Sequence, residues 1–387
     1  EIEGGSLHSE ALPEVSGFSS SSTAAAPVER SAPSLTSRFF GGLLFFAWSR
    51  DADTRLPVLA ALELHEVTRL MGRHAGSAAA REFSQVSKAV AHALRSIMPS
   101  VFSSAQQVYL CGGGYGMASD AGKFCPATGI FEALPPMRIA RRGCTSVSMG
   151  GRLFILGGTA LQCEQGCRSE MYNPGTQEWE LLPPCDRAFT HAGAASAGGF
   201  IYVFGGLSHG NILNQVLRFD PVCGQWVYLA PMPTPRFECA VASTKGRLHV
   251  LGGANASGEP LATAECYDTA QASWSAMPRL RHARYGGAAA GISGSVYLIG
   301  GHGIWGSLSE VERFDDELGR WVEMCSMPAP RNRCGAAVVA GCIHVFGGSS
   351  GCKEICSIDV LDPKTGYWRT CAQMRTPSSH NLAAVAC

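Results

Sequence analysis

Arginine and histidine recur at fixed distances behind a regularly spaced aromatic residue, and these side chains are the best candidates for chemistry in the sequence. The aromatic residues are Phe131, Trp179, Trp226, Trp274, Trp321 and Trp368. Ten to twelve residues beyond them stand Arg141, Arg142, His191, Arg236, Arg284, Tyr285, Arg331, Asn332, Arg333, Ser379 and His380. Guanidinium groups bind carboxylates through two parallel charge-assisted hydrogen bonds, so the set predicts a surface for an acidic partner.

Six glycine doublets supply the framework that positions these residues. The doublets begin at Gly112, Gly157, Gly205, Gly252, Gly300 and Gly347, and successive starts lie 45, 48, 47, 48 and 47 residues apart. Each doublet ends a short apolar run typical of a buried strand, and a further large apolar residue stands seven residues before each Phe or Trp. This period indicates stacked four-stranded units.

The combination of Gly-Gly, Tyr/Phe and Trp resembles the kelch repeat, which builds β-propeller blades. The resemblance implies an all-β fold, a six-bladed kelch propeller over residues 105–387. The aromatic residue precedes the next doublet by 26 residues in every copy that can be counted, whereas the return distance varies between 19 and 22. All length variation therefore falls between the second and third strands, which predicts an exposed loop there.

The ends of the repeat region predict how the ring closes. Five doublets follow a strand of small residues, but nothing comparable precedes Gly112. The missing strand stands at the other end of the sequence, in residues 381–387. We expect this segment to pair with residues 107–111, because an open propeller would expose strand edges.

The kelch resemblance also implies a binding site at one end of the central channel. In kelch-like ubiquitin adaptors the stretch containing residues 330–335 supplies pocket arginines, and the residue after each doublet, here including His302, faces the same pocket. The resemblance thus implies a substrate adaptor that holds an acidic peptide over Arg142, Arg333, His191 and His380. For Arg141, Arg236, Arg284 and Arg331 a second role stays open, that of tying blades together through buried carbonyl groups.

Other function classes are less favoured by the residues. A cytoskeletal (actin-binding) or scaffold role is the alternative among binding functions, and a sugar-converting enzyme is a third interpretation. No cofactor, metal site or catalytic set is expected, since the histidines show no ligand spacing and no phosphate-binding loop or nucleophile motif is found. The formal net charge of zero gives no argument for nucleic acid or membrane binding.

The first hundred residues differ from the repeats in composition and in apolar pattern. Residues 1–50, rich in Ser, Ala and Pro at their start, are expected to be a disordered or targeting segment. Residues 51–99 are expected to form a small helical unit, in which Leu56-Pro57 and the stretch from Arg81 to Lys88 resemble the F-box. That resemblance implies docking to a ubiquitin-ligase scaffold; a helical hairpin beside the propeller is the alternative.

The sixteen cysteines do not form a disulfide pattern. Cys144, Cys239 and Cys334 recur where the inner strand needs a small apolar residue, so we expect buried free thiols and a reducing location, cytoplasmic or nuclear. Cys163 with Cys167, and Cys352 with Cys356, lie in the variable loop. They are expected to be loop thiols, with a redox role left open.

Overall fold

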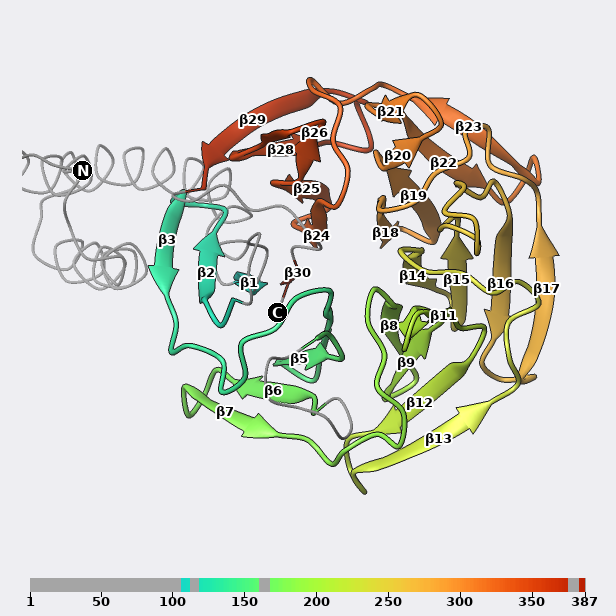
Figure 1. The fold of residues 1–387 in the computed structure, drawn as a ribbon. Helices are drawn as coiled ribbons and strands as arrows, with labels where there is room; N and C mark the ends of the chain where they lie inside the picture. The colour runs from blue at the N-terminus through green and yellow to red at the C-terminus, as the bar shows by residue number, and fades with distance from the viewer. Residues whose placement is uncertain (1–105, 112–117, 160–167, 375–382, 387) are drawn as a thin grey trace, which may run out of the picture. The chain divides into compact units, whose positions relative to one another are not determined.

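The described part of the chain is a ring of six four-stranded antiparallel sheets (Figure 1). In this computed structural model, residues 106–111, 118–159, 168–374 and 383–386 are described. The expectations for residues 1–50 and 51–99 lie outside these ranges. Within them, no helix is long and apolar enough to cross a membrane. The six-bladed all-β propeller predicted from the repeats is confirmed.

Each blade consists of four strands that follow one another from the propeller axis to the outside of the ring. Blades 1 and 2 contain β30 (Ala383–Ala386), β1 (Val108–Cys111), β2 (Ala121–Cys125), β3 (Ile130–Ala133) and β4 (Thr145–Met149), β5 (Arg152–Leu156), β6 (Glu170–Asn173), β7 (Glu178–Leu181). Blades 3 and 4 contain β8 (Gly193–Ala197), β9 (Phe200–Phe204), β12 (Val216–Asp220), β13 (Gln225–Leu229) and β14 (Ala240–Thr244), β15 (Arg247–Leu251), β16 (Ala264–Asp268), β17 (Ser273–Met277). Blades 5 and 6 contain β18 (Ala288–Ile292), β19 (Ser295–Ile299), β22 (Val311–Asp315), β23 (Arg320–Met324) and β24 (Gly335–Val339), β25 (Cys342–Phe346), β28 (Ser357–Leu361), β29 (Trp368–Gln373).

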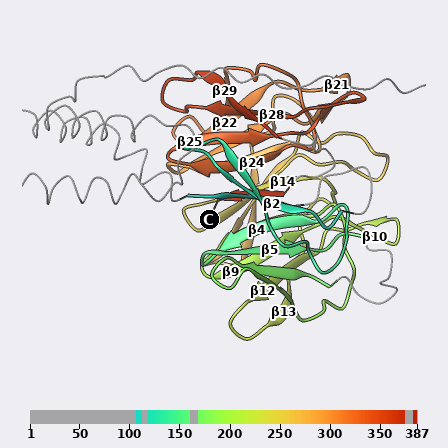
Figure 2. The same cartoon turned by 90° about the vertical axis from the view of Figure 1, so that its left-hand side faces the viewer.

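Three short hairpins extend the connections between the second and third strands. They are β10 (Leu207–Ser208) with β11 (Asn211–Ile212), β20 (His302–Gly303) with β21 (Gly306–Ser307), and β26 (Ser349–Ser350) with β27 (Lys353–Glu354). The side view shows β10 and β21 at the same end of the propeller (Figure 2). We call this end, with its hairpins and the connections entering each blade, the connection face.

The inner strands are made of small residues because they converge on the propeller axis. A Cβ atom on Gly193 would lie 2.5 Å from Val241 Cγ2, and one on Gly291 would lie 2.3 Å from the Ser243 carbonyl oxygen. The thiols expected in this region, those of Cys144, Cys239 and Cys334, are free and buried, and burial raises the pKa of Cys239 and Cys334 to about 11.

The ring closes as the sequence predicted, through residues 383–386. Strand β30 is antiparallel to β1, with Val108 opposite Ala386 and Cys111 opposite Ala383. The same strand contacts β24 of blade 6 and β4 of blade 2. The inner strands therefore form an unbroken circle, and the propeller has no exposed inner edge in the described residues.

An aromatic pair marks the outer half of blades 1 to 5, whereas blade 6 has Leu361 opposite Trp368. Tyr172 and Trp179, opposite each other on β6 and β7, have ring centroids 5.1 Å apart, and the indole Nε1 of Trp179 donates to the Pro135 carbonyl of blade 1 at 2.8 Å. The four other repeat tryptophans make the same bond to the preceding blade. Phe131 stands in blade 1 where the other five blades have Trp, and its ring has no N–H group to donate.

Two buried histidines make the stability of the propeller depend on pH. His249 and His344 lie on β15 and β25, 6% and 4% exposed, and burial lowers the pKa of each imidazole from 6.5 to about 4. The unfolded chain binds the proton more tightly than the folded chain. The free energy of unfolding therefore has its full value above about pH 6.5 and falls as the pH drops toward 4. Each histidine accounts for at most about 3 kcal/mol.

The test uses the aromatic residues that other blades place at this position, among them Phe154 and Tyr202. The double variant His249→Phe/His344→Phe should lose less unfolding free energy between pH 7.5 and 4.5 than the unaltered chain in urea titrations. An equal loss in both proteins would contradict this assignment.

Candidate functional site

In the described residues, four glycine doublets form a close backbone joint with the connection that enters the next blade. Both glycines have positive φ, 60° and 92° at Gly205 and Gly206. A Cβ atom on Gly205 would lie 2.2 Å from the Arg236 carbonyl oxygen, and the Gly206 N–H donates to that oxygen at 2.9 Å. The same bond recurs at Gly158, Gly253 and Gly301. Only glycine fits here, so the joint fixes where the following residues lie.

The four arginines ten residues beyond the aromatic lie inside the blades, at most 1% exposed. Arg284 donates to the Gly300 and Glu310 carbonyl oxygens at 2.8 and 2.9 Å and to Glu312 Oε1 at 2.5 Å. Equivalent bonds are made by Arg141, Arg236 and Arg331. Of the two roles open for these arginines, tying the blade together is the one the structure shows.

The carboxylates that form ion pairs with these arginines were not predicted from the sequence. They are Glu170, Glu265, Glu312 and Asp359, two residues before the large apolar residue of the third strand. Blade 3 has Phe189 in place of the arginine and Leu217 in place of the acid, both within one apolar cluster. Arginine and acid thus occur together or not at all, a signal that was readable from the repeats.

The residues at the eleventh position form the rim of the connection face. The five of them that the structure describes pair through the backbone with the residue after a doublet, as Arg142 does with Thr159 and Tyr285 with His302. The Tyr285 and His302 rings stack with centroids 5.1 Å apart and an angle of 22°. Asn332 is buried instead, and its amide bonds Ser307 at 2.7 Å. The two residue sets predicted to face one site therefore do lie together.

The residues at the twelfth position form a hydrogen-bonded belt around the channel. The N–H groups of His191, Glu238, Gly286 and Arg333 each donate to the carbonyl oxygen of the equivalent residue one blade earlier, at 2.6 to 2.9 Å. His191, Glu238 and Arg333 have φ near 50°, the left-handed region that non-glycine residues rarely adopt. The belt holds these three side chains in a fixed direction.

An ion pair spans two blades at the channel mouth. Arg333 binds Glu238 through Nε at 3.1 and 3.2 Å and through Nη2 at 2.9 Å, passing blade 5, which has only Gly286 at this position. Burial opposes the charge of Arg333, but Glu238 more than offsets it and raises its pKa. His191 Nε2 lies 4.0 Å from the same carboxylate. Glu238, which was not singled out in the sequence, therefore neutralises part of the predicted cationic ring.

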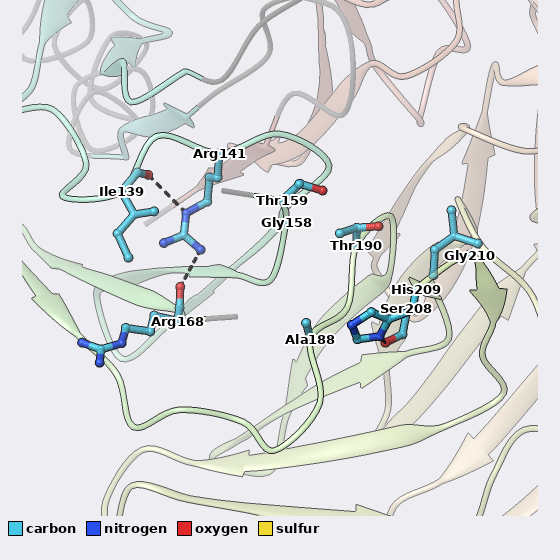
Figure 3. Close-up of a pocket in the computed structure, with 11 residues that line it drawn as sticks. Ile139, Arg141, Gly158, Thr159, Arg168, Ala188, Thr190, Ser208, His209 and Gly210 are labelled. Atoms are coloured by element: carbon cyan, nitrogen blue, oxygen red, sulfur yellow. Dashed lines mark hydrogen bonds between the residues drawn. The ribbon is translucent and has the colours of Figure 1, made fainter. Parts of the chain in front are cut away.

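A hollow of about 320 Å³ opens between blades 2 and 3 on the connection face (Figure 3). Its described lining is formed by Ile139, Arg141, Gly158, Thr159, Arg168, Ala188, Thr190, Leu207, Ser208, His209 and Gly210. Arg168 and His209 are exposed at its edge, and no carboxylate lines it among the residues described. Neither residue was a candidate in the sequence, because both stand in the loop of variable length.

Two predicted site residues, Ser379 and His380, lie outside the described residues. The structure brings His191, Tyr285, His302 and Arg333 to the connection face along with Arg142. Among the residues described, no group of three or more His, Cys, Asp and Glu side chains is arranged to hold a metal ion.

Comparison with known proteins gives consistent matches to kelch repeats. A family model described as the KLHDC2/KLHL20/DRC7 Kelch-repeats domain matches residues 194–387, and the Kelch motif matches residues 140–185. An F-box/kelch-repeat protein of Arabidopsis thaliana is 37% identical over 86 residues, 22% of this chain and 23% of that protein. Kelch-like protein 26 of Danio rerio is 32% identical over 87 residues, 22% of this chain and 14% of that protein. The matched segments thus span less than a quarter of either relative.

The solved structure of YjhT shows a similar architecture. It superposes with a TM-score of 0.61 at 17% sequence identity, covering 68% of this chain and 94% of that one. At this identity the likeness concerns the fold alone.

The paired occurrence of arginine and acid predicts a strong coupling between them. Arg284→Phe leaves the Glu312 carboxylate buried without its cation and should lower the unfolding free energy by about 3 to 5 kcal/mol. Arg284→Phe/Glu312→Leu, the pair that blade 3 uses, should recover at least half of that loss. Urea unfolding of both variants measures the coupling, and a double variant as unstable as the single one would contradict it.

Proposed function

The chain belongs to the kelch-repeat family, and from that premise we propose that its propeller is a protein-interaction module that holds an acidic segment of a partner protein. The segment binds on the connection face, at the hollow between blades 2 and 3. The observation that carries this proposal is the exposed guanidinium of Arg168 at the edge of a hollow whose described lining contains no carboxylate.

The cations around the hollow differ in how much charge they offer a partner. The Arg141 guanidinium is buried against Glu170 at 2.5 Å, so its charge is already compensated. Arg168 is exposed, and Arg142 is exposed on the rim, where its backbone pairs with Thr159 of the lining. The guanidinium groups of these two arginines are therefore the ones that a partner's carboxylate would contact first.

Arg333 is a weaker site for an anion than the sequence suggested. A ligand carboxylate would have to displace Glu238, which is only 6% exposed and bonded to both Nε and Nη2 of the arginine. Leaving Glu238 buried without its partner costs more than the new contact returns. The acidic group thus binds nearer Arg142 and Arg168, and the Arg333–Glu238 pair shapes the channel mouth.

The acidic segment can be tested with labelled peptides in pairs, each glutamate-containing peptide matched by its glutamine counterpart. Fluorescence anisotropy with the full chain should detect the acidic peptide. Arg142→Ala or Arg168→Ala should weaken its binding by about 1.5 to 3 kcal/mol. Lysine at either position should recover only part of the loss, and added salt should weaken binding.

A matched control is Arg320→Ala, which removes an exposed arginine from the start of β23, at the opposite end of the blade. This variant should bind like the unaltered chain. Equal binding of the glutamate and glutamine peptides would overturn the proposal.

We further propose that residues 54–98 deliver the bound protein to a ubiquitin-ligase scaffold. The support is the F-box resemblance of Leu56-Pro57 and residues 81–88, together with a relative that is itself an F-box/kelch-repeat protein. Ligase scaffold subunits should copurify with the full chain, and Leu56→Ala/Pro57→Ala should remove them without changing the melting curve of the propeller. Their absence from the unaltered chain's complexes would leave the segment as a packing hairpin.

A further inference from the structure

The hairpin of blade 5 displays two large apolar side chains to solvent on the connection face. His302 pairs with Ser307 and Gly303 with Gly306, which places Ile304 and Trp305 alone at the tip. The two are 71% and 94% exposed. The five repeat tryptophans, in contrast, all donate their indole N–H to a carbonyl oxygen of the preceding blade.

The fold does not require apolar residues at this tip. The equivalent hairpins of blades 3 and 6 have the same two-residue turn, with the tips His209-Gly210 and Gly351-Cys352. Glycine and polar residues suit such turns, and His209 and Gly210 both adopt the positive φ typical of them. Exposing an isoleucine and a tryptophan in water brings the turn no local advantage, and two adjacent exposed apolar residues form a surface that another molecule can cover.

The hairpin holds its tip in a fixed place before any partner arrives. Asn332 donates to Ser307 Oγ at 2.7 Å, and Ser349 Oγ donates to Asn332 Oδ1 at 2.9 Å. These bonds join the hairpins of blades 5 and 6, and strands β21 and β26 contact each other. A rigid aromatic side chain loses little conformational entropy on binding, which favours it as an anchor.

The tip adjoins the rim of the connection face at blade 5, which is separated from the hollow by blade 4 on one side of the ring and by blades 6 and 1 on the other. Tyr285 on the rim pairs with His302 through two backbone hydrogen bonds of 2.7 and 3.1 Å, and their rings stack. His302 is the first residue of the hairpin that ends at Trp305. The backbone pairing thus runs from Tyr285 and His302 at the rim to Ile304 and Trp305 at the tip. We call these four residues the aromatic strip; none of them has a permanent charge.

We propose that this strip anchors an apolar side chain of the same partner segment whose acidic group binds near Arg142 and Arg168. The inference rests on the proposed function and adds a second determinant: an extended segment with an acidic residue and, at a fixed separation, a large apolar one. The strip supplies an uncharged apolar surface, while the hollow supplies the cations, so the two contacts select different residues of one segment.

Selection from a displayed library of random peptides on the full chain tests the second determinant. Enriched peptides should combine an acidic and a large apolar residue at constant separation. The variant Ile304→His/Trp305→Gly, which copies the tip of blade 3, should enrich acidic peptides without the apolar residue. Tyr367→Ser is the matched control, since Tyr367 is 78% exposed in the turn before β29 and should leave the selection unchanged.

The outcomes separate this inference from the proposed function. If the unaltered chain enriches acidic peptides without an apolar residue at a fixed separation, the strip is excluded as a binding site and the proposed acidic site is retained. Apolar enrichment without acidic residues would overturn the acidic site and retain the strip. No enrichment over the tip variant would overturn the inference.

Tryptophan emission gives a second readout with a single enriched peptide. Its binding should shift the emission to shorter wavelength as Trp305 leaves water, and Trp305→Phe should abolish the shift. The affinity for that peptide should fall at least tenfold in Ile304→His/Trp305→Gly, with an unchanged melting curve. A peptide that binds the unaltered chain without either effect would exclude the strip from its binding site.

Discussion

The propeller depends on one close backbone approach, in which a glycine doublet lies against the carbonyl group of the chain entering the next blade. No side chain fits at Gly205, where a Cβ atom would lie 2.2 Å from the Arg236 oxygen. The approach fixes the connection, and the next residues then take separate directions: the tenth-position residue into the blade, the eleventh onto the rim and the twelfth into the channel belt. The proposed recognition surface is therefore confined to the rim and to the loops beyond the doublets.

Two chemically different residue pairs occupy the same position inside the blades. Four blades bury an arginine with a carboxylate, whereas blade 3 buries Phe189 with Leu217. A buried pair satisfies its own hydrogen bonds and those of neighbouring backbone groups, and an apolar pair avoids the desolvation cost altogether. The hollow lies beside blade 3, where the connection contributes no cation to the core and Thr190 and Ala188 form its wall.

The repeat pattern was sufficient to predict the blades, the closure and the exposed loops, because glycine and aromatic positions repeat at constant spacing. It was not sufficient to separate Arg331, which is buried, from Arg142, which is exposed, although the acid that accompanies each buried arginine was a usable signal. The Arg333–Glu238 pair could not be predicted, since it joins residues 95 positions apart across an intervening blade. The Ile304-Trp305 tip lies in the loop of variable length, and the repeat spacing carries no information about the role of the residues in that loop.

Closure by β30 has a consequence for the order of events during synthesis. Strand β1 leaves the ribosome with its inner edge unpaired, and its partner begins at residue 383, 272 residues after Cys111 (383 minus 111). At 5 to 20 residues per second that interval lasts roughly 15 to 55 s. Until the last strand docks, the edge of β1 that faces the propeller axis has no partner strand, and such an edge can pair with other chains.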